Sequence, residues 1–517
     1  MSQSEHYILA IDLGTGGPKV SLVGQRGDIA ASQIESVDVQ LLTKGGAEQN
    51  PAQIWNAIKT ACKGVIGSSG LPAEAIIGVI CCSQYVSIVP VDENGQPLMN
   101  MILWMDRRGN QHHVALHKEH PDALEIWSEI HGMPPLPGGT DSLAHMRWIK
   151  FDCPDIYART DKFLEPMDYV NLRFTGRPAA TQCTAFPMLL TDNRTLNAAD
   201  YDAELVRRSG IDAVKLPELI PVDGEVGTVL PEVASELGLL PSTKVFAGIN
   251  DTQAGAVGTA TFEGSHAGIC VGTTSVMLAD VDFKGTDSEH MIFSVPGAIP
   301  NHYTVMAENG LGGKVVEHFL ENIVFPDDDF GNNSSDECFS ALEKVVNSSP
   351  PGSKNLLFLP WLSGAFAPAE DENMRGGFLN MSLETTRADM ARAVLEGVAF
   401  NFRWLLPAVE SFTDKHFDYF MFSGGGAMSN TWPQILADIL ERPVHQMSDP
   451  RKVNTRGIGL LGFVHLGQLS LEELAKLCSV NQVFEPRVEY QARYNLLFDQ
   501  FIQAYKQNQP IFAALNQ

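Results

Sequence analysis

One pattern occurs twice in this chain and constrains its fold more than any other feature. The segment YILAIDLGTGGPKVSLV (residues 7–23) joins two apolar runs by a glycine-rich turn, and HAGICVGTTSVMLADV (residues 266–281) repeats this plan. Such runs predict β-strands, and the short turn predicts an antiparallel pair. Residues 28–36 predict a third strand after the first pair, and HMIFSVP (residues 290–296) is the candidate third strand of the second copy. We therefore expect an internal duplication whose second copy begins near Gly264.

A chain of 517 residues is longer than one hydrophobic core usually organises. Together with the duplication, this length predicts two domains, residues 1–256 and residues 257–517. Between the copies, strand patterns such as IIGVICC and KVFAGIN alternate with helical patterns such as NPAQIWNAIKTACKGVI, in which Asn50 would cap the helix and Pro51 would begin it. This alternation predicts an α/β fold in which helices flank a mixed central sheet.

The charge of the chain limits its partners. It has 62 acidic and 36 basic residues and a formal net charge of −26, which repels phosphate backbones and anionic lipids. We expect no nucleic-acid and no membrane partner. The first residues, MSQSEHYILA, lack the regions of a secretion signal, so we expect a cytoplasmic protein. Whether the chain forms a homodimer stays open, because an apolar face that meets a partner has the same pattern as one that meets the chain's own core.

The first glycine-rich turn is suited to bind phosphate. Gly14 exposes backbone N–H groups with no Cβ in the way, Thr15 adds a hydroxyl donor, and Lys19 adds a positive charge. Asp12 lies at the mouth of the turn, where a lone carboxylate would repel phosphates unless Mg²⁺ were also present. The turn leads into the strand pattern PKVSLV and not into a helix, which excludes the dinucleotide-binding and Walker A motifs. Taken alone, the turn could also be an ordinary hairpin.

Two further glycine-rich segments complete a nucleotide-binding pattern. The second turn, with Gly272, Thr273 and Thr274, repeats the glycine and threonine but lacks the aspartate, which suits an asymmetric nucleotide held between two domains. In FDYFMFSGGGAMSNTWPQILADIL, a strand ends in three glycines before an amphipathic helix. Bare backbone there would admit a flat ring, and the helix start offers unpaired N–H donors, so we expect an adenine site. A plain strand-to-helix connection is the alternative.

Asp251 directly follows the apolar strand of VFAGINDTQAGAVG and precedes a helix of small residues. A carboxylate in this position can cap the helix, and it can also project from the strand end. In the second role it would be a general base that takes a proton from a substrate hydroxyl as that oxygen attacks a γ-phosphorus, an effect of about two to four orders of magnitude in rate.

These four elements, in this order, resemble the FGGY family of carbohydrate kinases in the actin, Hsp70 and hexokinase-like superfamily. Further segments are similar to family motifs and span almost the whole chain: ILWMDRRG, FLEPMDYVNLRFTG, LPWLSGAFAPAEDENMRGGF and ADMARAVLEGVAFNFRW. The resemblance implies two ribonuclease H-like (actin-like ATPase) domains, with the active site in the cleft between them. It also implies that ATP, with Mg²⁺, phosphorylates a hydroxyl of a small sugar.

The resemblance assigns roles to individual residues. Asp251 would be the general base, and Asp12 and Asp251 would be the carboxylates directed at Mg²⁺. Gly313, in ENGLGGKVVEHFL, resembles a family glycine near the nucleotide. The residues expected to contact ATP are Gly14, Thr15, Lys19, Gly272, Thr273, Thr274, Gly313, Gly425, Gly426, Ala427 and Asn430.

The sugar-binding segments depart from the family pattern. Xylulose kinases carry GQMHG where this chain has SQYVS (residues 83–87), an expected Glu-Arg pair is Ala365-Phe366, and an expected lysine is His145. Because groups that read sugar hydroxyls decide specificity, these changes affect the substrate more than the fold. We expect the walls of the sugar site to include Gln84, Trp104, Asp106 and Asp251.

The sequence favours a ketopentose such as xylulose as the substrate. Another ketose, ribulose for example, or a glycerol-like polyol stays open. So does a sugar or nucleotide sensor of the same fold that has lost turnover, although the presence of both Asp12 and Asp251 argues against it. An actin- or Hsp70-like ATPase without a small substrate is a further alternative, and it would not need a carboxylate after AGIN.

Overall fold

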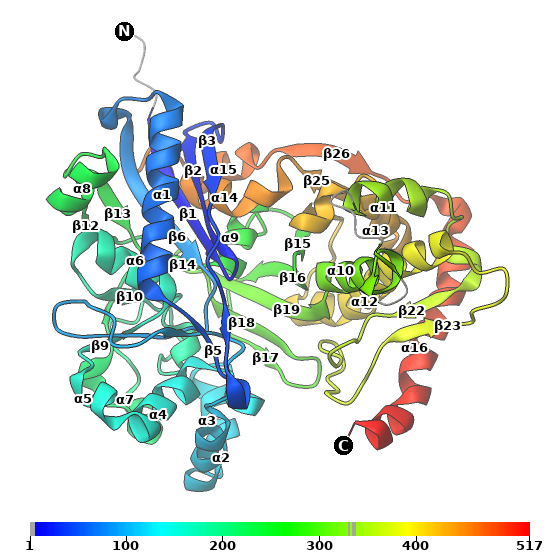
Figure 1. Ribbon diagram of the computed structural model, residues 1–517, viewed down its shortest axis with the longest axis horizontal. Helices are drawn as coiled ribbons and strands as arrows, with labels where there is room; N and C mark the ends of the chain where they lie inside the picture. Colours follow the sequence, from blue (N-terminus) through cyan, green and yellow to red (C-terminus); the bar gives the residue numbers. More distant parts are fainter. Residues whose placement is uncertain (1–5, 329–330, 333–337, 517) are drawn as a thin grey trace.

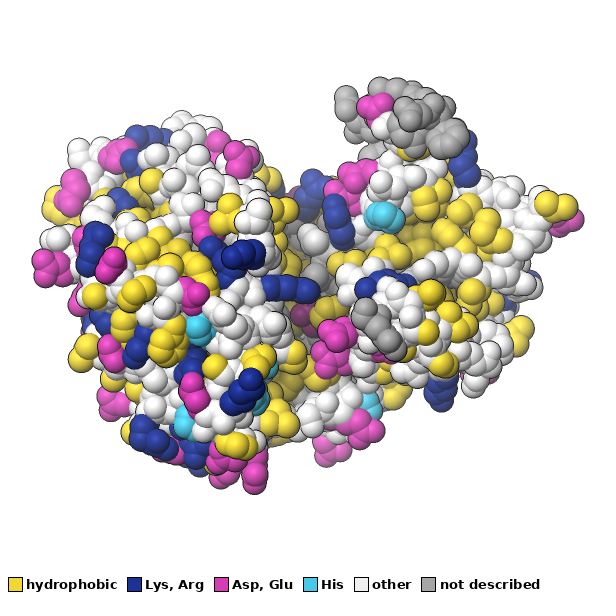
Figure 2. Space-filling view, turned by 60° about the horizontal axis from the view of Figure 1, so that its bottom comes forward, with side chains coloured by type: hydrophobic (Ala, Val, Ile, Leu, Met, Phe, Trp, Pro, Cys, Tyr) yellow, Lys and Arg dark blue, Asp and Glu magenta, His cyan; other side chains and the backbone are white. Residues whose placement is uncertain are grey.

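The computed structural model describes residues 6–328, 331–332 and 338–516, which form two lobes (Figure 1). In this described part of the chain, each lobe is built around one large mixed sheet, seven-stranded in the first lobe and eight-stranded in the second. Helices pack on the sheets, and Figure 2 shows a deep hollow in the surface between the lobes. The predicted α/β class with mixed sheets is confirmed.

The sheet of the first lobe has the strand order β12-β13-β6-β1-β2-β3, and β14 pairs with the end of β6. The strands are β1 (Tyr7–Gly14), β2 (Gly17–Gly24), β3 (Ile29–Ile34), β6 (Ile76–Ser83), β12 (Glu225–Thr228), β13 (Lys244–Phe246) and β14 (Ile249–Asn250). β2 is antiparallel to both of its neighbours, β1 and β3, whereas β6 and β13 continue the sheet in parallel with β1. The strand predicted over residues 244–250 is therefore two short strands, separated at Ala247, whose N–H bonds to Gly224 instead.

The sheet of the second lobe repeats this arrangement. Its order is β17-β18-β19-β16-β15-β24-β25-β26, with β15 (His266–Val271), β16 (Thr274–Val281), β17 (Thr286–Asp287), β18 (Ile292–Pro296), β19 (Tyr303–Leu311), β24 (Tyr419–Ser423), β25 (Val444–Met447) and β26 (Val480–Phe484). The run β19-β16-β15-β24-β25 has the same strand directions as β3-β2-β1-β6-β13. The predicted duplication is thus present in both sheets.

One predicted strand has a different place in the sheet. Residues 290–296 do form a strand, β18, but β19 lies between it and β16, so β19 is the third strand of the second copy. The reason is an insertion between β16 and β19, which folds into the short pair of β17 and β18 and extends the edge of the sheet.

Sixteen α-helices lie in the described residues. They are α1 (Pro51–Ser69), α2 (Asn110–Glu119), α3 (Ala123–Ile130), α4 (Ser142–Asp152), α5 (Pro154–Arg159), α6 (Pro166–Thr175), α7 (Ala203–Ser209), α8 (Pro231–Leu237), α9 (Asp251–Gly258), α10 (Gly313–Phe319), α11 (Cys338–Asn347), α12 (Arg387–Thr413), α13 (Trp432–Leu440), α14 (Val453–His465), α15 (Leu471–Leu477) and α16 (Val488–Leu515). The predicted cap of α1 is confirmed: the Asn50 side chain accepts hydrogen bonds from the N–H groups of Ala52 and Gln53. Within the described residues, none of the helices is long and apolar enough to cross a membrane.

The remaining strands form small sheets outside the two large ones. They are β4 (Gln40–Leu41), β5 (Ala47–Gln49), β7 (Val89–Val91), β8 (Met101–Ile102), β9 (Lys162–Leu164), β10 (Ala179–Thr181), β11 (Glu218–Ile220), β20 (Asp327–Asp328), β21 (Gly331–Asn332), β22 (Leu357–Leu359) and β23 (Gly377–Leu379). Of these, β5 and β8 lie next to the residues of the predicted sugar site.

A helix from the second half of the chain packs on the sheet of the first lobe. Ile458 and Leu461 of α14 share a buried apolar cluster with Ile8 and Val23. The contact is close because Gly459 has no side chain: a Cβ there would lie 2.5 Å from the Val23 Cβ. The C-terminal half of the chain therefore contributes to both lobes, which a division at residue 256 does not anticipate.

Candidate active site

Three strand ends bring the predicted residues of the first lobe together. Leu13 of β1 and Asn250 of β14 both lie beside Ser83 of β6 in parallel register. Parallel strands present their carboxyl ends at one edge of a sheet, which is where ligands bind in many α/β proteins. The glycine-rich turn after β1, Gln84 and Asp251 therefore share this edge.

Asp12 is buried and paired with Lys19. Lys19 Nζ lies 3.1 Å from Asp12 Oδ2, and the Cys82 thiol donates to Asp12 Oδ1 at 3.6 Å. The negative charge of Asp12 raises the pKa of Lys19 above its usual value. The two residues lie directly opposite each other on β1 and β2, so their side chains meet. In this structure the lysine expected at the phosphates neutralises Asp12 instead.

Asp251 is the first residue of α9 and is half-buried. Asn250 occupies the N-cap position, so the helix-cap alternative does not describe the Asp251 side chain. Burial raises the pKa of Asp251 to about 7, and the negative charge of Asp12 acts in the same direction. A carboxyl group that titrates near neutral pH can both accept and release a proton.

The Thr15 hydroxyl connects the first turn to the predicted sugar site. It donates to Gln84 Oε1 at 2.6 Å and accepts from the indole N–H of Trp104 at 3.2 Å. Gln49 completes the network: its amide donates to the Thr15 carbonyl at 2.7 Å and accepts from Gln84 Nε2 at 3.0 Å. The hydroxyl donor that the sequence assigns to a phosphate is thus engaged by Gln84 in this structure.

The second turn has the equivalent place on the second sheet. Cys270 of β15 pairs with Ser423 of β24 in parallel register, so the turn after β15 and the triple glycine after β24 share one edge. Gly313 lies against this turn, with its N–H donating to the Gly272 carbonyl at 2.7 Å. The predicted residues exposed here are Gly272, Thr273, Gly425 and Asn430, and Thr274 and Gly426 are half-buried. Ala427 is fully buried, so it leaves no free surface for the predicted contact with adenosine.

The edges of the two sheets face each other. Helix α9, which begins at Asp251, contacts β1 and β6 of the first sheet and β15 and β16 of the second. Burial raises the pKa of the Cys270 thiol, and the charges of Asp251, Lys19 and Asp12 all act on this thiol. Asp251 therefore lies close to both glycine-rich turns.

The glycines of these segments fall into two groups. At Gly17 an added Cβ would lie 2.2 Å from the Glu35 carbonyl oxygen, so the fold requires glycine there. At Gly14, Gly272 and Gly425 the nearest protein atom would be 3.9 Å or more from such a Cβ, and none of the three has a positive φ. Neither packing nor backbone conformation requires glycine at these three positions. Glycine there leaves room for a ligand to approach the backbone.

The two predicted sugar-site residues of the 102–109 segment differ in their placement. Trp104 is 39% exposed, in keeping with a contact surface. Asp106 is fully buried, and Arg108 and the Ala47 N–H donate to its two carboxylate oxygens, with the shortest distance 2.6 Å. The expected direct contact between Asp106 and the sugar is therefore absent from this arrangement, because its oxygens hold the loop in place.

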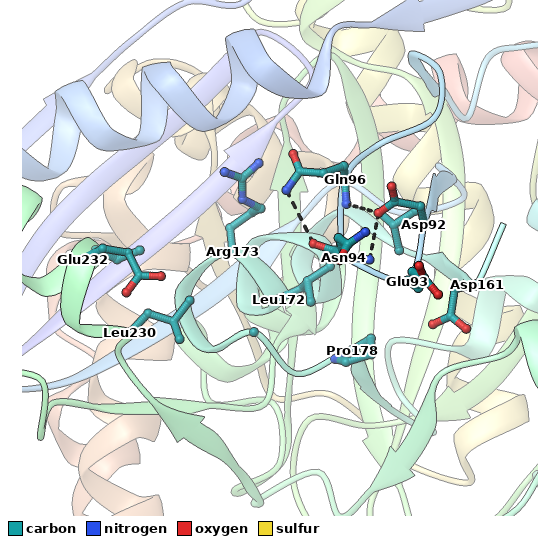
Figure 3. Close-up of a pocket in the computed structure, with 14 residues that line it drawn as sticks. Asp92, Glu93, Asn94, Gln96, Asp161, Leu172, Arg173, Pro178, Leu230 and Glu232 are labelled. Atoms are coloured by element: carbon teal, nitrogen blue, oxygen red, sulfur yellow. Dashed lines mark hydrogen bonds between the residues drawn. The ribbon is translucent and has the colours of Figure 1, made fainter. Parts of the chain in front are cut away.

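A separate pocket of about 350 Å³ lies in the first lobe (Figure 3). The turn that follows β7 forms one wall, and the end of α6 and the start of α8 form the others. In Figure 3 the Asp92 carboxylate accepts hydrogen bonds from the backbone of Asn94 and Gln96. None of the predicted site residues lines this pocket, so it is distinct from the site described above.

Comparison with known protein families decides the class of the protein. The profile of the FGGY family of carbohydrate kinases, N-terminal domain, matches residues 7–258, and that of its C-terminal domain matches residues 267–466. The chain belongs to the FGGY family of carbohydrate kinases. The expected family and enzyme class are thus confirmed.

Relatives within the FGGY family act on different sugars. The chain is 28% identical over 512 residues to a xylulose kinase of Bacillus subtilis (strain 168), covering 98% of each chain. It is 25% identical over 505 residues to a gluconokinase of the same organism, covering 96% of this chain and 95% of the relative. A ligand-bound xylulose kinase from Lactobacillus acidophilus has the same fold, with a TM-score of 0.85 at 23% identity over 99% of this chain and 100% of that one.

Two positions at which this FGGY kinase departs from the family pattern, His145 and Val86, lie close to the predicted sugar-site residues Asp106 and Gln84. Nε2 of His145 is 3.0 Å from the Asp106 carbonyl oxygen, and burial lowers the pKa of this histidine. Val86 has a φ of 59°, a conformation that β-branched residues rarely adopt. Strain of this kind persists where the surroundings enforce it, and it is common in binding loops.

Sequence reasoning missed two residues near this candidate site, Gln49 and Glu308, whose charge acts on Tyr85. Gln49 ends β5 of a small sheet and reaches Thr15 and Gln84 only through the fold. Glu308 lies on β19, the strand whose place the sequence did not indicate. The sequence around each residue contains no motif that indicates a binding role. Each comes near the site only because strands that are distant in the sequence pair with each other.

Proposed function

We propose that this kinase transfers the γ-phosphoryl group of ATP to a hydroxyl of a small sugar, a ketopentose such as xylulose. The observation that carries the proposal is the Asp251 carboxyl group, which lies close to both glycine-rich turns and has a pKa raised to about 7. A carboxyl group with such a pKa is suited to take the proton of a hydroxyl group at neutral pH. The xylulose kinases among the relatives support this substrate, and another ketose or a polyol is the alternative.

ATP would lie across the cleft between the lobes. Its phosphates would contact the turns at Gly14 and Gly272, and its adenosine would lie on Gly425, Gly426 and Asn430. The free space above Gly14, Gly272 and Gly425 supports this placement. The fold does not require glycine at these positions, whereas a bound ligand close to the backbone would. The exposed Thr273 is placed to add a hydroxyl donor to the phosphates.

Asp12 and Asp251 fit a role in holding Mg²⁺. Their negative charges act on each other, and a divalent cation relieves such repulsion. Within the described residues, no group of three or more His, Cys, Asp or Glu side chains could hold a metal ion. Mg²⁺ is commonly held by one or two carboxylates together with substrate phosphates, and it neutralises the charge of those phosphates.

In the proposed reaction, the hydroxyl oxygen of the sugar forms a bond to the γ-phosphorus of ATP. The bond between this phosphorus and its bridging oxygen breaks, and ADP leaves with the bonding electrons. Asp251 takes the hydroxyl proton. The network of Thr15, Gln49 and Gln84 would orient the sugar beside Asp251.

Release of ADP, measured over a panel of ketoses and polyols, tests this proposal. We expect one sugar of the panel to raise ADP release well above the rate with ATP alone. Nucleotide binding without stimulation by any sugar would contradict the proposal and would favour a sensor of the same fold. This sensor is the strongest rival, because the chain has SQYVS in place of the family's sugar-binding motif. The proposal includes a cytoplasmic location, where ATP and small sugars meet.

A further inference from the structure

Strand β19 has one face toward the core of the second lobe and one toward the first lobe. Val305 and Ala307 are fully buried in the core of the second lobe. Met306, on the opposite face, packs against an apolar cluster of the first lobe, and the Tyr85 hydroxyl donates to its sulfur at 3.7 Å. Alternate residues of a strand share a face, so Glu308 lies on the same face as Met306.

Glu308 and Asp251 both lie near Tyr85. Thr252 Oγ1 lies 3.4 Å from both the Tyr85 hydroxyl and Asp251 Oδ1. The charges that act most on Tyr85 are Asp251, Glu308 and Glu165, all of which are acidic. Glu308 thus lies on the side of β19 that is turned toward Tyr85, which is close to the position where the sugar would meet Asp251.

Glu308 keeps an exposed surface through which a ligand can reach it, although the surrounding protein removes part of its water. Among the residues that the structure describes, none forms an ion pair or a side-chain hydrogen bond with it, and loss of water in the cleft alone raises its pKa. The positive charge that acts most on Asp251 is Lys19, which is already paired with Asp12. A negatively charged substrate would therefore meet like charges here, whereas a sugar hydroxyl would find an acceptor.

We propose that Glu308 is a specificity-determining residue that restricts the substrate to uncharged sugars and polyols and rejects sugar acids such as gluconate. This inference rests on the proposed function, because that function places the sugar beside Asp251. Gluconate is the sugar acid to test, because gluconokinases are among the relatives of this chain.

Binding and turnover of neutral sugars and of gluconate would test the role of Glu308. The full chain would be compared with Glu308→Gln and with the control Glu384→Gln, which changes an exposed glutamate in the turn before α12. Isothermal titration gives the affinities, and ADP release gives kcat/KM. We expect the wild type to prefer the best neutral sugar over gluconate by about 100-fold or more. Glu308→Gln should reduce this preference by about tenfold or more, whereas Glu384→Gln should leave it unchanged.

The outcomes separate this inference from the proposed function. A wild type that prefers gluconate, or an unchanged preference in Glu308→Gln, overturns the role of Glu308 even when the protein is an active kinase. Neutral sugars that bind, with a preference relaxed by Glu308→Gln but no ADP released, support the role of Glu308 and overturn the proposed function. A wild type that binds neither neutral sugars nor gluconate overturns both.

Discussion

The pH dependence of turnover should follow the ionisation of Asp251. Burial and the charge of Asp12 raise the pKa of this carboxyl group to about 7. Because of this raised pKa, Asp251 is mostly protonated below pH 7, and the protonated carboxyl group cannot act as a base. Since only the ionised form can take the hydroxyl proton, turnover should rise with pH through about 7 and then level off.

The size of this effect follows from the same pKa. A single group with a pKa of about 7 is about one-tenth ionised at pH 6 and about nine-tenths ionised at pH 8, so kcat/KM for the sugar should rise about tenfold between these values. Chromatographic measurement of ADP at saturating ATP and Mg²⁺ avoids coupling enzymes with pH limits of their own. A flat profile from pH 5 to pH 8 would refute the assignment of Asp251 as the base.

Replacing Asp12 tests the cause of the raised pKa. Asp12→Asn removes one of the two effects that raise the pKa of Asp251 and leaves the positive charge of Lys19 unpaired, which lowers this pKa further. The acid limb of the profile should therefore move to lower pH. Each profile is normalised to its own plateau, because Asp12→Asn also removes a proposed Mg²⁺ carboxylate. An acid limb at the same pH in both proteins would show that the Asp12 charge does not act on Asp251.

Four further substitutions test separate parts of the site and the fold. Asp12→Ala should weaken Mg²⁺-dependent ATP binding by about tenfold or more, measured by titration with and without Mg²⁺, and equal affinities would remove its proposed role. Gly272→Ala should weaken ATP binding and leave the melting temperature unchanged, whereas Gly313→Ala, whose Cβ would lie 2.4 Å from the Gly272 carbonyl oxygen, should destabilise the fold by about 1–3 kcal/mol. If both variants lower the melting temperature equally, the space above Gly272 is not reserved for a ligand. Gly459→Ala should also destabilise the protein by about 1–3 kcal/mol in urea unfolding, because its Cβ would lie 2.5 Å from that of Val23. A gain in stability, as expected for Gly→Ala in a free helix, would contradict the packing of α14 on the first sheet.

Local patterns predicted the elements that depend on near neighbours. The hairpin of β1 and β2, the cap of α1 at Asn50 and the duplication all follow from short-range rules of strand alternation, turn residues and helix capping. The motif order also indicated the FGGY family. Residues at the ends of parallel strands could be inferred in the same way. Gln84 and Asp251, for example, each follow an apolar run.

Features that depend on distant parts of the chain could not be predicted. The sequence pattern of the insertion does not indicate that β16 pairs with β19, the strand that follows the insertion. The pattern therefore predicts β18 at the position that β19 occupies. The partners of Asp106 could not be predicted for the same reason. Its carboxylate accepts hydrogen bonds from Arg108 and from the Ala47 N–H, and Ala47 comes close only because β5 pairs with β8. The face of the sheet on which Glu308 lies follows only from the pairing of β19 with β16.

The most direct test of the central claim is phosphoryl transfer by Asp251→Asn. The amide has nearly the shape of the carboxyl group but cannot accept the hydroxyl proton. We expect sugar-dependent ADP release to fall by about two to four orders of magnitude, with the ATP dissociation constant nearly unchanged. Sugar phosphorylation by Asp251→Asn at the wild-type rate would contradict the claim that this carboxylate deprotonates the substrate.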